Sequence, residues 1–210
     1  MRVYQALAFI AIAAAPVAAM ADNLNLSSGT ATYSVTGPVS GTAAVITSPN
    51  AAWTASISGA QWIGPNANSG YTNLPNGGYV YTTMFTLTST SDLSGSFASD
   101  NSASAVLTGS TISGSDLLGA NTYADSYTTV TPFSAILGPG TYTLSFDVEN
   151  GSGLPTGPGT DGNSDAGPTG LLVGATTVTA AATPEPSSLA LLGTGILGAA
   201  GIARRRLFSR

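Results

Sequence analysis

Short runs of alternating apolar and polar residues dominate the chain between residues 22 and 183. In the clearest run, 141–149, every second side chain is apolar, and turn-forming residues stand on both sides of it: Gly138, Pro139 and Gly140 before, Asn150 and Gly151 after. A period of two predicts a β-strand with one buried face. Its apolar face would hold Tyr142, Leu144, Phe146 and Val148.

A second run, Tyr79 to Thr88, places Tyr79, Tyr81, Phe85 and Leu87 on one face. Further predicted strands are 31–36, 43–47, 52–58, 95–99, 103–107, 127–136 and 170–179. Short strands at fairly regular spacing, separated by Gly, Pro and Asn turns, are typical of β-sandwiches. We therefore predict an all-β fold, an antiparallel β-sandwich of jelly-roll type.

The amino terminus has the pattern of a signal peptide. Arg2 is followed by an apolar stretch over 6–15, and Pro16 ends that stretch. Ala19 and Ala21 then form the small-x-small pattern that a signal peptidase accepts. The pattern predicts a signal helix in residues 1–21, export across the inner membrane, and cleavage before Asp22.

The carboxyl terminus contains a different set of elements. Pro184, Glu185 and Pro186 precede an uncharged run over 187–203, and Arg204, Arg205 and Arg206 follow this run directly. As a helix the run would span about 26 Å, which is marginally enough to cross a bilayer. The arginines would keep the carboxyl end in the cytoplasm. We predict a transmembrane helix and basic tail over 187–210.

Together these three elements resemble the PEP-CTERM sorting signal of Gram-negative bacteria. That resemblance implies recognition by an exosortase, a membrane transpeptidase, and removal of the helix and the basic tail. It also implies a host that makes exopolysaccharide, and a product that reaches the cell envelope or the extracellular matrix. Permanent anchoring and release both remain open.

The resulting organisation is a signal peptide (1–21), a sandwich domain (22–179), a linker with the Pro-Glu-Pro motif (180–186) and the tail (187–210). Within the sandwich, residues 151–170 are rich in Gly, Pro and Ser, which predicts a long exposed loop.

The charge distribution excludes several partners. All five basic residues are arginines at positions 2, 204, 205, 206 and 210, so residues 22–183 carry nine acidic side chains and no basic one. Nucleic acids and anionic membrane surfaces are bound through Lys and Arg, so neither is expected as a partner of the sandwich. The chain has no cysteine, which excludes disulfides and thiolate chemistry.

The sandwich sequence also resembles galactose-binding-like domains of exported proteins. The residues that carry this resemblance are the tryptophan stretches 52–54 and 61–65, the aromatic strand 79–88, the runs 93–101 and 106–109, and the final segments 140–150 and 168–171. The sequence departs from the usual pattern because it lacks an arginine near its last strand. The resemblance implies the fold and suggests a sugar ligand.

Aromatic and amide side chains are the candidate sugar contacts. Trp53 and Trp62 have two readings, as stacking platforms or as core anchors, and the apolar residues beside them favour the core. Tyr71, Tyr123 and Tyr127 lie in more polar stretches and are the better stacking candidates. Asp100 and Asn101 bind ligand hydroxyls, help to bind Ca²⁺ or form a turn, and the turn is favoured.

Two acidic groups are candidates for metal binding and catalysis. Asp161, Asn163 and Asp165 offer oxygens at alternating positions, but the glycine and glutamate of a complete calcium loop are absent, so a solvated loop is favoured. Asp147 and Glu149 are two residues apart on one strand, about 7 Å, which fits a pair of glycosidase carboxylates. The favoured reading is a polar, solvated strand face.

With no histidine in the chain, and no Lys, Arg or Cys in the sandwich, the usual general bases and nucleophiles are missing. We expect a non-enzyme that needs no cofactor, works at the envelope or in the matrix, and either binds polysaccharide or adds structure. The alternatives are a carboxylate-dependent glycan hydrolase and a self-associating surface protein.

Overall fold

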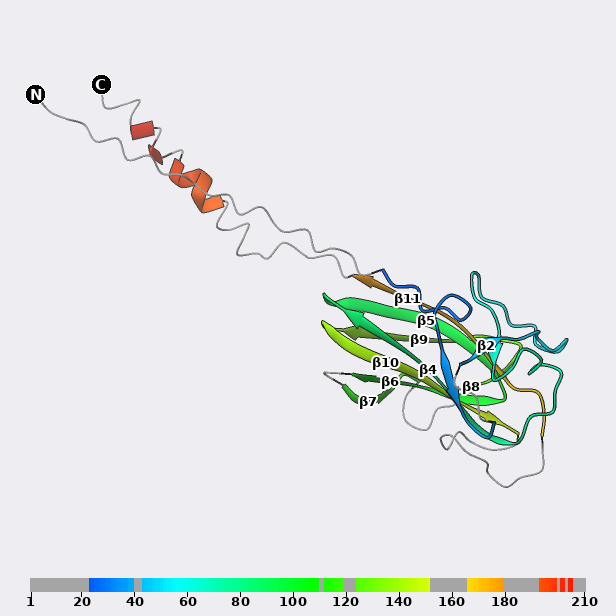
Figure 1. Cartoon of the computed structure of the whole chain (residues 1–210). Helices are drawn as coiled ribbons and strands as arrows, with labels where there is room; N and C mark the ends of the chain where they lie inside the picture. The colour runs from blue at the N-terminus through cyan, green and yellow to red at the C-terminus, as the bar shows by residue number, and fades with distance from the viewer. Residues whose placement is uncertain are drawn as a thin grey trace, which may run out of the picture.

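The structure is a computed structural model that describes residues 23–39, 43–109, 112–118, 124–151, 166–179, 193–199, 201–202 and 204–205. Two antiparallel sheets pack face to face as a sandwich (Figure 1). The predicted β-sandwich is confirmed. The signal peptide at 1–21 and the linker at 180–186 lie outside the described residues.

The first sheet contains strands β1, β4, β10, β6 and β7 in that order, with β8 also paired to β6. Their bounds are β1 Ser34–Thr36, β4 Gly77–Leu87, β6 Ser102–Gly109, β7 Ile112–Asp116, β8 Ala124–Asp125 and β10 Gly140–Asn150. The second sheet has the order β2, β3, β11, β5, β9. Its bounds are β2 Val45–Ile46, β3 Ile63–Gly64, β5 Ser91–Asp100, β9 Thr131–Leu137 and β11 Gly170–Thr179.

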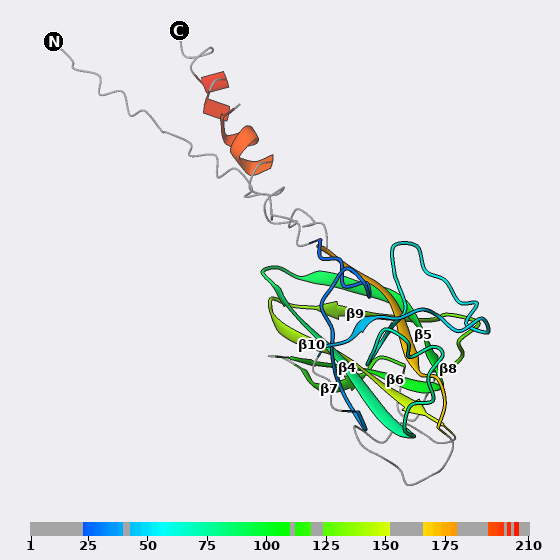
Figure 2. The same ribbon diagram turned by 45° about the vertical axis from the view of Figure 1, so that its right-hand side comes forward.

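The chain changes sheet at each step from β4 to β5 and β6, and again from β9 to β10 and β11. This alternation is the connectivity of a jelly roll, which folds long hairpins across two sheets. Figure 2 shows the two layers from a turned view, with β4, β10 and β6 in one layer and β5 and β9 in the other.

The core lies between the sheets and follows the predicted period of two. Tyr142, Leu144, Phe146 and Val148 of β10 are fully buried, as are Tyr79 and Tyr81 of the neighbouring β4. Phe97 and Phe133 come from the opposite sheet, and their ring centroids lie 5.1 and 5.8 Å from that of Phe146. Aromatic rings at these distances add to the free energy of apolar burial.

One predicted strand is wrong. Residues 52–58 join neither sheet. Trp53, Ala55 and Ile57 instead point onto the outer face of the second sheet, where they pack in a cluster with Ala98, Trp62 and Leu172. Apolar and polar residues do alternate in this stretch, but its apolar side chains pack against the face of a sheet, and the stretch adds no strand to that sheet. We call this stretch the cover segment.

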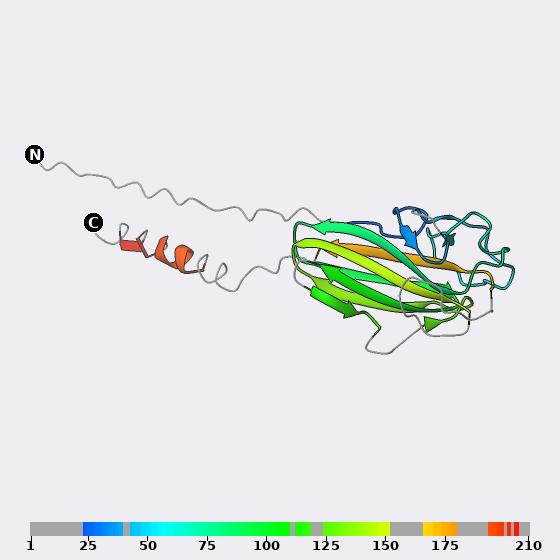
Figure 3. The same cartoon turned by 60° about the horizontal axis from the view of Figure 1, so that its bottom comes forward.

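The two ends of the sandwich domain leave it at the same place. The Leu24 amide donates to the Thr177 hydroxyl at 3.1 Å, and the Thr177 amide donates to the Leu24 carbonyl at 3.0 Å. The first described residues therefore lie beside the end of β11. Residues 47–62 lie towards the opposite end (Figures 1 and 3). Beyond β11, residues 193–199, 201–202 and 204–205 are helical. In the described part of the chain, no helix is long and apolar enough to cross a membrane, and the transmembrane helix over 187–210 stays a prediction.

Candidate binding pocket

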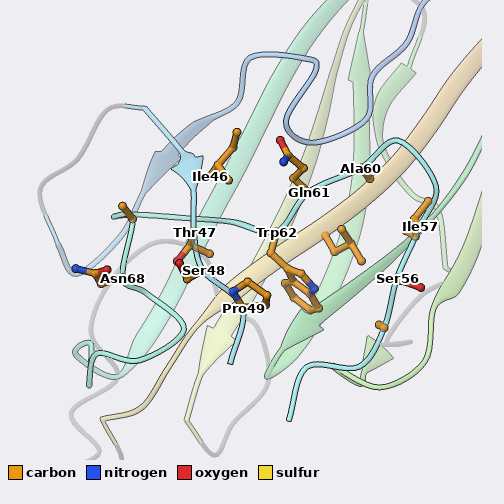
Figure 4. Close-up of a pocket in the computed structure, with 13 residues that line it drawn as sticks. Ile46, Thr47, Ser48, Pro49, Ser56, Ile57, Ala60, Gln61, Trp62 and Asn68 are labelled. Atoms are coloured by element: carbon orange, nitrogen blue, oxygen red, sulfur yellow. The ribbon is translucent and has the colours of Figure 1, made fainter. Parts of the chain in front are cut away.

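A pocket of about 540 Å³ opens on the outer side of the second sheet, beside the cover segment (Figure 4). Leu172 of β11 and the indole of Trp62 form part of its apolar lining, together with Ile46, Pro49, Ala55 and Ile57. Its polar lining comes from Thr47, Ser48, Ser56, Gln61 and Asn68. None of the residues described as lining this pocket is charged.

Backbone hydrogen bonds hold the loops around the pocket. The Thr47 amide donates to the Trp62 carbonyl at 2.9 Å, and the Ser48 amide donates to the Ala67 carbonyl at 3.1 Å. On the other side, the Gln61 amide donates to the Ser28 carbonyl at 2.9 Å. The walls are therefore tied to each other and to the amino-terminal segment.

Trp62 is positioned through a second tryptophan. The ring centroids of Trp53 and Trp62 are 4.6 Å apart, and the two ring planes are tilted by 33°. The Trp53 indole nitrogen donates to Oδ2 of Asp100 at 2.7 Å. Because a buried indole N–H needs a partner, Asp100 sets the orientation of Trp53, and Trp53 in turn supports the pocket wall. Both tryptophans are only 6% exposed, which confirms the core reading of both.

Two glycines of β11 make room for the cover segment. A Cβ on Gly170 would lie 2.7 Å from Cη2 of Trp53, and a Cβ on Gly174 would collide with Cγ2 of Ile57. The cover segment can therefore approach the sheet closely only because these two positions lack side chains.

The predicted ligand residues are spread over the molecule. Tyr71 is 65% exposed and is not among the pocket residues, whereas Tyr127 is half-buried and packs against the tryptophan cluster. Asn101 lies in the turn between β5 and β6, where its Oδ1 accepts from the Gly151 amide at 3.0 Å. The carbonyl of Asp100 accepts from the Thr169 hydroxyl at 2.8 Å. Both residues therefore take part in structural contacts, and their role in ligand binding stays a prediction.

Several other predicted residues fall outside the described part of the chain: Tyr123, Asp161, Asn163, Asp165, Pro184, Glu185, Pro186 and Arg206. Arg204 and Arg205 are described and exposed. Among the described residues there is no group of three or more Asp, Glu, His or Cys side chains that could hold a metal ion.

The carboxylate pair of β10 lies on the outer face of the first sheet, across the sandwich from the pocket. Asp147 pairs with Val80 and Ser104, and Glu149 pairs with Gly78. The prediction of a solvated strand face is wrong for Glu149, which is 1% exposed. Position along a strand determines which face a side chain occupies, but burial depends on what the rest of the chain places over that face.

Sequence reasoning did not select Gln61, Asn68 or Ile57 as site residues. Gln61 lies directly before Trp62 in the sequence, and its position beside a tryptophan is the one feature that could have marked it as a site residue. The pocket itself arises from loops that are distant in sequence, so no local pattern contains it.

Comparison with known proteins identifies the carboxyl-terminal region. Residues 182–206 are a PEP-CTERM protein-sorting motif. The PEP-CTERM motif therefore begins three residues after β11 ends at Thr179. It implies an exported protein that is sorted at the membrane and processed by an exosortase.

No curated protein matches the chain. Among solved structures, the chain is similar to a GH2 β-galacturonidase from Eisenbergiella tayi bound to glycerol, with a TM-score of 0.36 and 16% identity. The same type of enzyme from this organism, bound to galacturonate, gives a TM-score of 0.33 and 17% identity. In both cases the aligned region covers 78% of this chain and 26% of the other, so the chain spans about a quarter of those proteins.

Proposed function

We propose that this exosortase-sorted protein is a non-catalytic saccharide-binding module of the cell envelope or extracellular matrix, and that its ligand occupies the pocket beside the cover segment. The observation that carries the proposal is an uncharged pocket that combines apolar side chains with amide and hydroxyl groups. Sugars present both C–H faces and hydroxyls, and such mixed linings suit them.

The chemistry of the pocket favours a neutral ligand. The sandwich has no basic side chain, so nothing in it would pair with a carboxylate or a phosphate. Gln61 and Asn68 provide both hydrogen-bond donors and acceptors, which matches the dual character of a sugar hydroxyl. No calcium is required by this lining.

The position of the pocket supports a role in display. β11 runs from the pocket, at Leu172, to the end that continues into the PEP-CTERM motif. Seven residues of strand correspond to about 23 Å. An anchored copy would therefore present the pocket away from its point of attachment.

The absence of a catalytic role is part of the proposal. Its support is the residue inventory, which leaves carboxylates and hydroxyls as the acid–base groups of the sandwich. The carboxylate pair, Asp147 and Glu149, belongs to the opposite sheet from the pocket.

Retention of the full chain on immobilised neutral polysaccharides (dextran, xylan and agarose) tests this function. Gln61→Ala and Asn68→Ala remove exposed polar groups of the pocket, and each should weaken binding about tenfold, the effect of about 1.4 kcal/mol. Tyr71→Ala is the matched control, because Tyr71 is exposed outside the pocket, and it should bind like the unaltered chain.

A chelator should leave retention unchanged. Calcium-dependent retention would indicate that the binding site is the acidic loop at 161–165. Loss of binding only in Tyr71→Ala would indicate that the loop tyrosines form the binding site. No retention on any matrix, including the polysaccharide of the host, would contradict the binding function. Release of sugar that stops in Asp147→Asn and Glu149→Gln would make the protein a hydrolase.

A further inference from the structure

Strand β9 forms one edge of the second sheet. It pairs with β5 along its whole length, from Thr131 opposite Phe97 to Leu137 opposite Ser91. In the described part of the chain, no backbone hydrogen bond joins β9 to any element other than β5. Among the described residues, its other side is therefore a row of backbone donors and acceptors without a strand partner.

The edge is not protected by charge. Proteins commonly block exposed edges with charged side chains, but β9 (TPFSAIL) contains none. Ile136 is 78% exposed, more than any other large hydrophobic side chain that the structure describes. Pro132 interrupts the row, because a proline at an edge lacks the N–H that would point towards the free side, so a partner strand there receives one hydrogen bond fewer.

We propose that β9 pairs antiparallel with β9 of a second copy of this chain and joins the two second sheets into one. The strand is complementary to itself. With a two-fold axis at Ser134, the exposed Ile136 lies opposite Pro132 of the other copy, and the two Ser134 side chains face each other. On the inner face, Phe133 lies opposite Ala135. Every cross-strand pair is uncharged.

Charge opposes a second copy less at this strand than at the charged parts of the sandwich. The sandwich carries nine acidic side chains and no basic one, so any contact that includes charged side chains of both copies would bring like charges together. An uncharged strand avoids that cost. The long-range repulsion remains, and association should therefore strengthen as the ionic strength rises.

The absence of cysteine allows a direct test with single-cysteine variants of the full chain. Ser134→Cys places two thiols opposite each other at the axis, within disulfide reach. Ser94→Cys is the matched control, because Ser94 is also exposed and pairs directly with Ser134 one strand inward. Two copies of Ser94 would be about 14 Å apart, which is three strand spacings.

Under mild oxidation, Ser134→Cys should form the disulfide-linked dimer roughly tenfold faster than Ser94→Cys or more, since paired strands raise the effective thiol concentration. Adding Ile136→Glu should remove this advantage, whereas adding Met84→Glu should not, because Met84 is 70% exposed but lies on β4 of the first sheet, which takes no part in the proposed pairing. Equal rates in the two cysteine variants would overturn the proposal, as would an advantage insensitive to Ile136→Glu.

Discussion

Three buried tyrosines of the sandwich differ in what their hydroxyl groups contact. Tyr33 donates to the Leu26 carbonyl at 2.8 Å, and Tyr79 donates to the Pro75 carbonyl at 2.9 Å. The hydroxyl of Tyr81 is buried and has no hydrogen-bond partner among the described residues. Burial raises the pKa of Tyr79 to about 12, and it raises the pKa of Tyr33 and Tyr81 as well. All three remain protonated in the folded protein at neutral pH.

Removing the Tyr81 hydroxyl should therefore stabilise the protein. Tyr81→Phe eliminates a buried polar group without partner, and the free energy of unfolding should rise by about 1 kcal/mol. Tyr33→Phe is the matched control and should lower it by about 1 kcal/mol, because the Leu26 carbonyl loses its donor. Urea unfolding followed by tryptophan fluorescence measures both. A Tyr81→Phe variant less stable than Tyr33→Phe would contradict this account.

At the scale of elements, local alternation predicted strands well where a strand lies between two neighbours. β4, β10 and β11 are such strands, and the predicted bounds of β11 match the observed ones. The predictions failed for short pieces: β3, β7 and β8 were not expected, and 52–58 was expected but joins no sheet. The two-residue strands β3 and β8 are too short to show a period, and β7 (ISGSD) contains a single large apolar residue. A segment that joins no sheet can use an alternating pattern to cover one.

The cover segment depends on the missing side chain of Gly174. In Gly174→Ala the new Cβ would collide with Ile57, so the cover segment must shift. The free energy of unfolding should therefore fall by about 1–3 kcal/mol. Saccharide retention should fall as well, because Ile57 lines the pocket. Gly138→Ala is the control, since its Cβ would meet no atom within 4 Å and should leave both properties unchanged. Equal stability of the two variants in thermal unfolding would show that the cover segment is loosely held.

At the scale of the whole molecule, the chain divides its tasks between the two ends of the sandwich. The sorting motif follows the end of the sandwich at which β11 ends, and it begins three residues after that strand. The proposed ligand pocket lies towards the other end. A short connection limits how far the sandwich can move from the membrane before processing, because an extended chain reaches about 3.5 Å per residue.

The sorting step can be tested through the Pro-Glu-Pro element. Replacing Pro184, Glu185 and Pro186 with alanine should leave most of the chain unprocessed in the host membrane, with its helix and basic tail retained. Intact-mass spectrometry of the membrane and medium fractions measures this. Thr176→Ala, an exposed change in β11 just outside the motif, should be processed normally. Normal processing of the triple-alanine chain would show that other residues of the motif direct the enzyme.

By itself, the sequence determined the properties that depend on local pattern and composition. The period of two specified an all-β sandwich and its inward face, the order of elements at the tail specified the sorting motif, and the missing basic residues specified an acidic body. Each of these can be read within a few neighbouring residues or from a count.

The tertiary structure alone decided which segments meet. Residues 52–58 pack against the face of a sheet instead of joining it as a strand, and Glu149 is buried. Asp100 accepts a hydrogen bond from Trp53, and one pocket is lined by residues as distant in sequence as Ile46 and Leu172. The physical reason is that alternation states only that a segment has an apolar face. What covers that face is set by pairing across the whole chain, and no local pattern records it.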